Sequence, residues 1–254
     1  MTRSFKYIKL FGMSLLTTIF NEAFYRPLFN GLIFLYNAIP YHDFGLAIIL
    51  LTIIIRLILY PLNQKAIKSQ KALNDLQPQI KEIQAKYKSD RAKQSTELMA
   101  LYRQKGINPA SGCLPLLIQL PVLFALYRVF WNGLKPESLN SLYSFISRPD
   151  LINPWFLSLI DLSKSNWLMA FLAGALTFVQ SKMMAPSQSK NNAAGDFTAM
   201  FSRQMVYFMP IMTVVIAWKL PAGLALYWIV ITLFGIVQQY LITRKKNGKE
   251  LVKN

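Results

Sequence analysis

Five apolar stretches, each close to the length needed to cross a lipid bilayer, constrain this 254-residue chain more than any other feature. Inside the hydrocarbon no water can hydrogen-bond free backbone groups, so a spanning segment must be helical or part of a closed barrel. Long, continuous apolar runs favour helices. The expected spans are residues 44–62, 114–134, 167–185, 204–219 and 222–243. The fold class predicted from them is an all-α polytopic membrane protein with five transmembrane helices.

The first span contains a single charged side chain, Arg56. An arginine placed within the hydrocarbon is costly, so it normally faces water, a partner or the interior of a bundle. The other four spans contain no Asp or Glu that could neutralise it. A buried cation without an anion in reach indicates a hydrated cavity.

The charge of the connecting segments predicts their orientation. Lys and Arg total 28 against 11 Asp and Glu, a formal net charge of +17. Residues 61–113 carry ten basic and four acidic side chains, whereas residues 135–166 carry three of each. Positive segments remain in the cytoplasm. Residues 63–106 and the tail, residues 244–254, are therefore expected inside, with the C-terminus cytoplasmic in a multi-pass membrane protein.

Two short segments precede the first span. Residues 1–23 combine basic residues with a short apolar run, which fits an uncleaved anchor or a cleaved signal-like segment. Residues 24–40 repeat apolar side chains at helical spacing, with Arg26, Asn30 and Asn37 expected on the opposite side. This pattern predicts an amphipathic helix on the outer interface. Residues 41–243 would then form the five-span core.

The basic segment 63–106 is predicted to form a cytoplasmic helical hairpin. Its first helix carries apolar residues at alternating steps of three and four, a short coiled-coil stripe. A polar break at 88–90 precedes a second helix over 91–105. The stripe consists of Leu73, Leu76, Ile80, Ile83 and Tyr87.

Amide side chains from three other spans lie at a depth similar to that of Arg56. From the rise of about 1.5 Å per residue, Arg56 lies roughly 9 Å from the cytoplasmic end of its span. The amides, roughly 6–8 Å deep, are Gln119, Gln180, Gln238 and Gln239. They could hydrogen-bond between helices while Arg56 reaches lipid phosphates, or they could line a hydrated recess open to the cytoplasm. Both interpretations remain open from the residues alone.

Several function classes find no support in the sequence. The only histidine, His42, and the only cysteine, Cys113, form no catalytic or metal-ligating cluster at one depth. We therefore expect no enzyme activity, no metal and no cofactor. The basic residues flank apolar spans, which argues against specific DNA binding and favours contact with anionic lipids. A small-molecule transporter or channel is the alternative, although no internal repeat supports it.

Four sequence blocks resemble the YidC family of membrane protein insertases, which is related to the mitochondrial oxidase-assembly and chloroplast Albino insertases. The blocks are IIIRLILYPL, LQPQIKEIQAKY, LMALYRQKGINPASGCLPLLIQLPVLFALY and FMPIMTVVIAWKLPAGLALYWIVITLFGIVQQYLI. They occur in family order between about residues 27 and 244. The short connection at 41–43 resembles that of the small, single-module bacterial form, which implies a location in the bacterial plasma membrane.

The resemblance implies five spans around a hydrophilic groove that opens to the cytoplasm and to lipid, with Arg56 as its central cation. Gln180 and Trp228 would line the groove, with Gln119 and Tyr227 nearby. Expected partners are nascent membrane proteins, with the Sec translocon and the ribosome as further candidates. The basic tail that would contact the ribosome or lipid is short: Arg244, Lys245, Lys246, Lys249 and Lys253.

Overall fold

The computed structural model describes residues 17–108, 114–133, 136–185 and 197–250, and helices account for most of them. The expected segment 1–23 therefore lies largely outside the described residues, as does Lys253 of the tail. The α-helices are α2 (Arg26–Ala38), α3 (Phe44–Ile58), α4 (Tyr60–Asp75), α5 (Gln77–Lys86), α6 (Arg91–Gln104), α7 (Leu114–Arg128), α8 (Trp167–Met184), α9 (Phe197–Lys219) and α10 (Ala222–Glu250). The two strands, β1 (Trp155–Phe156) and β2 (Ile160–Asp161), pair antiparallel.

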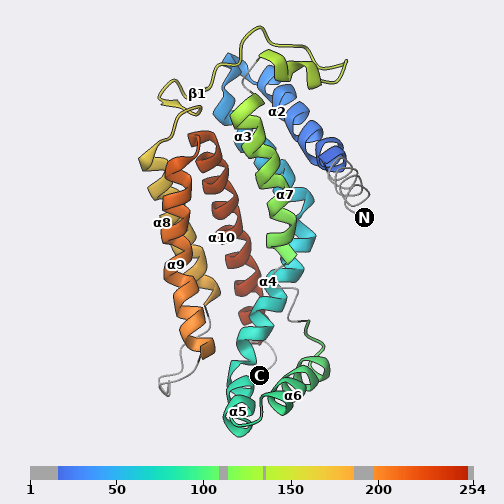
Figure 1. Cartoon of the computed structure of the whole chain (residues 1–254), viewed down its shortest axis with the longest axis vertical. Coiled ribbons are helices and arrows are strands. Elements are labelled where there is room, and N and C mark those ends of the chain that lie inside the picture. The colour runs from blue at the N-terminus through green and yellow to red at the C-terminus, as the bar shows by residue number, and fades with distance from the viewer. Residues whose placement is uncertain (1–16, 109–113, 134–135, 186–196, 251–254) are drawn as a thin grey trace, which may run out of the picture.

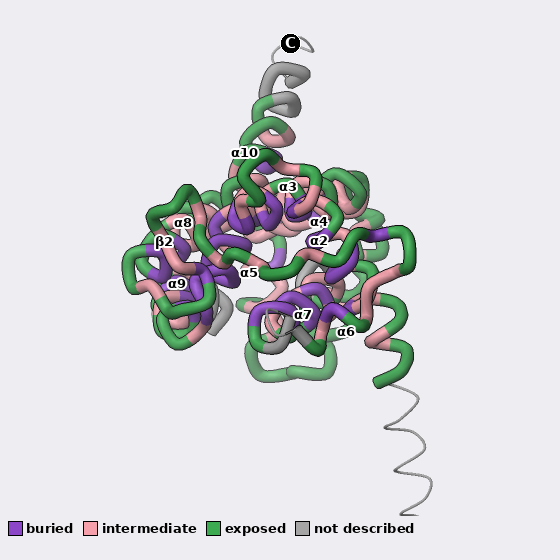
Figure 2. The backbone as a smooth tube through the Cα atoms, turned by 90° about the horizontal axis from the view of Figure 1, so that it is seen from above, coloured by how far each residue is buried: buried purple, intermediate pink, exposed green. Residues whose placement is uncertain are grey.

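Helices α3, α7, α8, α9 and α10 run along the long axis of the molecule (Figure 1). Helix α10 contacts α3, α8 and α9, and α8 and α9 form the most extensive helix pair. Gly174 permits this close approach, because a Cβ built on it would lie 2.2 Å from a methyl carbon of Val214. Viewed along the bundle, the buried segments are concentrated between the helices (Figure 2).

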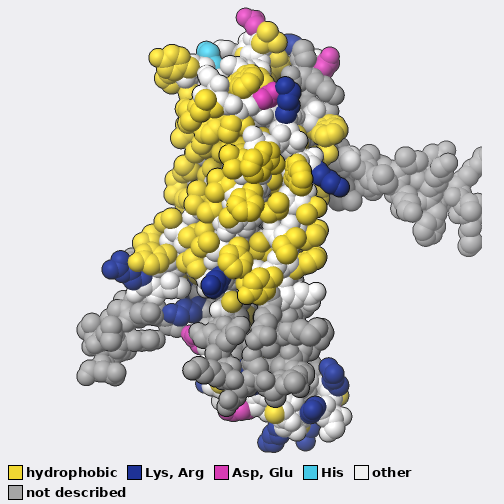
Figure 3. Space-filling view, turned by 90° about the vertical axis from the view of Figure 1, so that its left-hand side faces the viewer, with side chains coloured by type: hydrophobic (Ala, Val, Ile, Leu, Met, Phe, Trp, Pro, Cys, Tyr) yellow, Lys and Arg dark blue, Asp and Glu magenta, His cyan; other side chains and the backbone are white. Residues whose placement is uncertain are grey.

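The outer surface of the bundle is apolar over its middle, with basic side chains toward the end that carries α5 and α6 (Figure 3). By length and hydropathy, α8 and residues 222–244 of α10 could each cross a membrane. The bent pair α3 and α4 could form a third span, and residues 117–131 and 206–219 form shorter apolar helices. These properties are those of a multi-pass membrane protein.

The first span does not continue straight to residue 62 as expected. Helix α3 ends at Ile58, and α4 departs from it at an angle of 66°. Pro61 explains the bend, because it has no backbone N–H to donate to the carbonyl of Leu57 one turn earlier. Other helices extend past the expected limits, since α9 begins at Phe197 and α10 continues to Glu250. Polar residues can prolong a helix beyond the hydrocarbon, which hydropathy alone does not detect.

Helix α2 packs against α3 and α7. The prediction that Arg26, Asn30 and Asn37 form its polar side is only partly correct. Asn30 is 1% exposed, so the prediction that it faces away from the packed side is wrong. Its amide donates to the carbonyl of Ser141 at 3.1 Å and accepts from the backbone N–H of Tyr143 at 2.6 Å. Asn37 donates to the carbonyl of Ser147 at 2.7 Å. The two amides tie α2 to the 136–147 segment.

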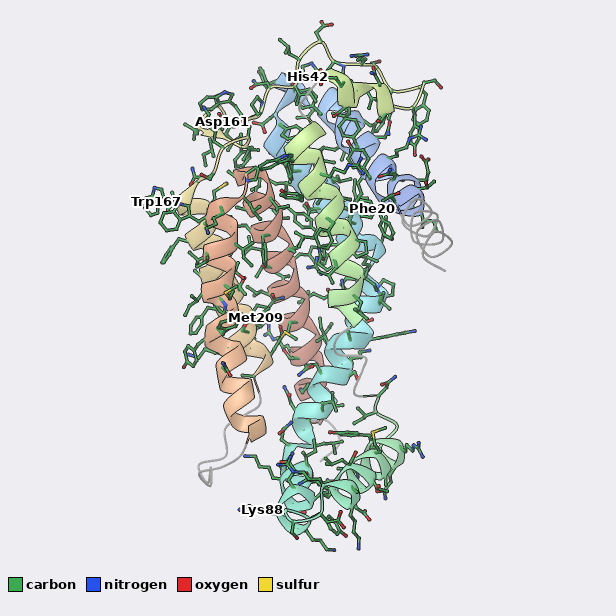
Figure 4. The ribbon with its side chains drawn as sticks, viewed as in Figure 1. Phe20, His42, Lys88, Asp161, Trp167 and Met209 are labelled. Carbon is green, nitrogen blue, oxygen red and sulfur yellow. The ribbon has the colours of Figure 1, made fainter. Side chains whose placement is uncertain are left out.

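The β-hairpin ties together the ends of α3 and α10. Asp43 accepts from the N–H of Leu46 at the start of α3, and its second oxygen accepts from the N–H of Leu157 at 2.6 Å. The first amides of α10, at Ala222 and Gly223, donate to carbonyls of the segment that follows β2. We call this end of the bundle the cap end; His42, Asp161 and Trp167 lie there, opposite Lys88 (Figure 4).

Asp161 stabilises the turn that follows β2. Partial burial favours its neutral form, but hydrogen bonds from the hydroxyl and N–H of Ser163, together with the ammonium of Lys164 at 3.0 Å, outweigh burial. The pKa of Asp161 is therefore lowered. The turn keeps this carboxylate ionised at neutral pH.

At the opposite end, which we call the hairpin end, α5 and α6 pack against each other. Leu76 and Ile80 of the expected stripe are buried with Leu101 of α6, and Ile83 packs at the edge of this cluster. Leu73 lies outside the cluster, and Tyr87 contacts the ammonium groups of two lysines. The packed stripe is too short to establish a coiled coil. Burial raises the pKa of Tyr102, which borders the cluster.

Replacing Asn30 with Ala should destabilise the protein by about 1–3 kcal/mol, because it removes a buried amide whose hydrogen bonds satisfy the half-buried backbone groups of 141 and 143. The matched substitution Asn37→Ala removes a single hydrogen bond, which is more exposed to solvent than those of Asn30. It should therefore destabilise the protein less. Thermal unfolding of the detergent-solubilised variants measures both. Equal destabilisation by the two substitutions would contradict the buried role of Asn30.

Candidate functional site

Three helices bring together a polar cluster around Arg56, which lies in the last turn of α3. Tyr227 of α10 is 1% exposed and lies within electrostatic range of the guanidinium. Gln119 of α7 is half-buried, and its Nε2 donates to the hydroxyl of Tyr227. The tyrosine thus connects the amide of one helix with the cation of another.

Arg56 has few protein partners for its hydrogen-bond donors. It forms no ion pair within the described part of the chain. Its Nε is buried, and no described residue accepts its hydrogen. A buried guanidinium N–H without an acceptor is costly, so it requires water or a bound polar group. Chemically, this position can bind a carboxylate or a carbonyl oxygen.

A second polar group lies where α10 crosses the start of α4. Gln238 is 2% exposed, and its Nε2 donates to the carbonyl of Tyr60 at 3.1 Å. The Oε1 of Gln238 and the Nδ2 of Asn63 are both buried without a described partner. Tyr60 is four residues beyond Arg56, so this group lies next to the first one on the hairpin side. The crossing therefore carries one unpaired donor and one unpaired acceptor.

Gln180 of α8 lies against Gly235 of α10. A Cβ built on Gly235 would lie 2.3 Å from Nε2 of Gln180, so only a glycine leaves room for the amide there. Trp228 is half-buried and packs against the main core, while Gln239 is 5% exposed. The predicted residues Gln119, Gln180 and Gln238 thus come from α7, α8 and α10, and each contact that the structure describes for them includes a residue of α10.

The predicted tail contacts are described only in part. Arg244 is exposed, and its guanidinium lies 5.9 Å from the ring centroid of Tyr240. For Lys245, Lys246 and Lys249 the structure describes the backbone alone. Their contacts with ribosome or lipid remain predictions.

Three residues of these polar groups were not predicted from the sequence. Asn63 lies seven residues after Arg56, which is two helical turns, and this spacing could have identified it. The predicted hairpin, residues 63–106, includes it because the first apolar span ends at residue 62. The carbonyl of Tyr60 is an acceptor that no side-chain pattern reveals. The role of Gly235 depends on its contact with Gln180 of another helix, which the sequence does not reveal.

Comparison with known proteins places this arrangement in a family. Residues 34–250 match the family described as 60Kd inner membrane protein. The membrane protein insertase YidC of Fusobacterium nucleatum is 36% identical over 223 residues, which cover 87% of this chain and 97% of that protein. The chain belongs to the YidC family. The YidC insertase of Oceanobacillus iheyensis is also 36% identical, over 91% of this chain and 86% of its own length.

A solved structure agrees with the sequence matches. A crystal structure of an active YidC insertase with its first transmembrane domain resolved is 35% identical and has a TM-score of 0.56. The match covers 85% of this chain and 46% of that one. YidC relatives and the apolar helices make this a multi-pass protein of the bacterial inner membrane. The relatives are named insertases, which does not favour a transporter or channel.

Gly235→Ala should displace the Gln180 amide and weaken any client contact that this amide makes. Alanine is the better helix former by about 1 kcal/mol, which offsets much of the cost of moving a flexible side chain. We therefore expect near-normal thermal stability with reduced client insertion in proteoliposomes. Gln180→Ala should reproduce the loss, and the double variant should be no worse than either single one. Fully additive losses would show that Gly235 acts independently of Gln180.

Proposed function

We propose that the protein inserts client membrane proteins by holding their hydrophilic segment at Arg56 while their hydrophobic segment moves into lipid. The observation that carries this proposal is the guanidinium at the junction of α3, α7 and α10, which has a buried Nε without a described acceptor. A carboxylate or backbone carbonyl of a client supplies the missing acceptor. The same protein would also aid the folding and assembly of its clients.

The site would lower the free-energy cost of moving the client's hydrophilic segment across the bilayer by dividing that movement into smaller steps. A polar segment in bare hydrocarbon loses all its hydrogen bonds with water, at a cost of several kcal/mol for each unpaired group. In a partly dehydrated recess, attraction between Arg56 and an acidic client residue is stronger than in bulk water. The membrane potential can then draw acidic residues outward, at about 2.3 kcal/mol per charge for each 100 mV. Hydrophobic transfer of the client's apolar segment completes the reaction without a nucleotide.

The proposed arrangement in the membrane has five spans, α3, α7, α8, α9 and α10, around a groove that opens toward the hairpin end. That end, with the tail, would face the cytoplasm, as the excess of basic residues in 61–113 indicates. The groove residues would be Arg56, Gln119, Gln180, Tyr227, Trp228, Gln238 and Gln239. Nascent chains, the Sec translocon, the ribosome and anionic lipids are the proposed partners.

Replacing Arg56 by Glu should reduce insertion of a single-span client with an acidic leading segment by at least about tenfold, equivalent to ~1.4 kcal/mol. Ala should cause a smaller loss, and Lys should retain part of the activity, because it keeps the charge but not the planar fork. Reconstituted proteoliposomes, with protease protection of the client's translocated end, measure insertion.

Arg128→Glu provides a matched control elsewhere in the bundle. Arg128 is exposed, donates to the Oδ1 of Asn21 and lies over the ring of Tyr25 at 4.7 Å, so it holds the π-helical segment Asn21–Tyr25 that precedes α2. We expect its replacement to affect stability more than the preference for acidic clients. Normal insertion of the acidic client by the Arg56→Glu variant would rule out the proposal that Arg56 binds the client's acidic residues.

A further inference from the structure

A separate pocket lies at the hairpin end, beyond the Arg56 cluster. Its volume is about 470 Å³, within the range of roughly 300–1,000 Å³ that ligand sites occupy. The walls come from α4, the beginning of α5, the end of α8 and one turn of α10. The lining includes lysines, an aspartate, several carboxamides and apolar side chains, so a ligand there meets both charged and apolar surface.

The pocket lies at the level where two candidate membrane spans end. Met184 is the last residue of the span Trp167–Met184, and Thr243 is one residue before the end of the span Ala222–Arg244; both residues line the pocket. Leu241 of α10 is exposed and continues the apolar outer surface to this level. Lipid headgroups lie just beyond the hydrocarbon, so the pocket is within their reach.

Two lysines of the pocket differ from the other lysines of the protein in their burial. Among the lysines whose side chains the structure describes, only Lys71 of α4 and Lys81 of α5 are half-buried, and both line this pocket. Lys65 and Lys68, also on α4, are exposed. A lysine normally keeps its ammonium in water, so partial burial of two beside one cavity favours an anion there. Each ammonium has three hydrogens, so a contact with one neighbour leaves donors for a ligand.

Asp75 also lines the pocket and limits which anion fits. Two ammonium groups and one carboxylate leave one positive charge in excess, which attracts a singly charged phosphate. The carboxylate accepts hydrogen bonds and would repel a bare phosphate. It therefore favours a headgroup that also carries a donor, such as a hydroxyl or an ammonium. A choline group has no such donor.

Carboxamides add both donors and acceptors to the lining. Gln77 and Gln239 line the pocket, and neither side chain has a hydrogen-bond partner among the described residues. Asn74 holds two walls together, because its Nδ2 donates to the carbonyl of Met184 at 2.9 Å. An amide N–H can donate to a phosphate oxygen, and an amide C=O can accept from a hydroxyl or an ammonium. The pocket thus has groups for both parts of such a headgroup.

We propose that this pocket binds the phosphate of a phospholipid whose headgroup also carries a hydroxyl or ammonium donor. Lys71 and Lys81 would bind the phosphate, and Asp75 would accept from the donor. The acyl chains would lie along the apolar outer surface of α8 and α10. The bound lipid would fasten the base of the hairpin formed by α5 and α6 to the ends of these two helices. This site does not depend on client capture at Arg56.

Native mass spectrometry of the full-length protein, titrated with single phospholipids, tests the site. The lipids are phosphatidylglycerol, phosphatidylethanolamine and phosphatidylcholine with identical acyl chains. The double substitution Lys71→Gln with Lys81→Gln removes the two lining charges. Lys65→Gln with Lys68→Gln is the matched control, because it removes two exposed charges of α4. Thermal unfolding of each variant checks that it is folded.

We expect the Lys71→Gln, Lys81→Gln variant to bind phosphatidylglycerol and phosphatidylethanolamine at least about tenfold more weakly than wild type, because it loses charge-assisted hydrogen bonds. The matched control should bind both lipids normally. Replacing both lining lysines by Arg should retain binding, because the charges remain. Wild type should bind phosphatidylcholine more weakly than the other two lipids, and Asp75→Asn should reduce this preference.

Three results would overturn the proposal. Equal losses in the two glutamine variants would show that net charge alone attracts the lipid. An unchanged headgroup preference in the Asp75→Asn variant would contradict the role of the carboxylate. Displacement of the bound lipid by an equal concentration of soluble glycerol phosphate would show a site for a soluble phosphate instead. Each of these results would leave the function proposed for Arg56 intact.

Discussion

A guanidinium with no carboxylate among its described neighbours, placed between three helices, is the constraint on which the rest of the structure depends. An isolated charge of this kind is tolerated only where water or a polar ligand can reach it. Helix α10 supplies Tyr227 beside it, and α7 supplies the amide that bonds to this tyrosine. The bundle therefore has polar groups in its interior, between α3, α7 and α10, and an apolar outer surface.

The two ends of the bundle differ in how their polar groups are paired. At the cap end, Asp43 joins the start of α3 to the β-hairpin, and Asn30 joins α2 to the 136–147 segment. Toward the hairpin end, Arg56, Asn63 and Gln238 each retain a buried atom without a described partner. Among the described residues, the buried side-chain atoms without a partner thus lie toward the hairpin end, as the proposed entry of polypeptide from that side requires.

The apolar runs were sufficient to predict the helical class and the approximate position of each long helix. Their ends were less predictable, because Pro61 bends the chain after Ile58 and polar residues extend α9 and α10. Helical spacing placed Asn30 on the polar side of α2, but a segment more than 100 residues away covers it. Periodicity cannot anticipate a partner so distant in the sequence.

The residue types of the candidate site were predictable from the sequence, but the contacts between these residues were less so. An arginine within an apolar span and glutamines at similar depth are visible in the sequence, and Arg56 and Gln119 do meet at Tyr227. Depth along a helix does not specify which face points inward, so the contacts of Gln180 with Gly235 and of Gln238 with Tyr60 were not predictable. The pocket beside Gln239 is formed by residues of four helices, α4, α5, α8 and α10, and has no local sequence signature.

A charge-exchange experiment tests most directly whether Arg56 pairs with the client. Insertion is measured for wild-type protein and the Arg56→Glu variant, each with a client whose leading segment carries Asp and with one in which those residues are Lys. Direct pairing predicts that the glutamate variant discriminates against the acidic client and recovers activity toward the basic one relative to wild type. Equal losses for both clients would show that Arg56 supports the fold or the hydration of the bundle without contacting the client's charge.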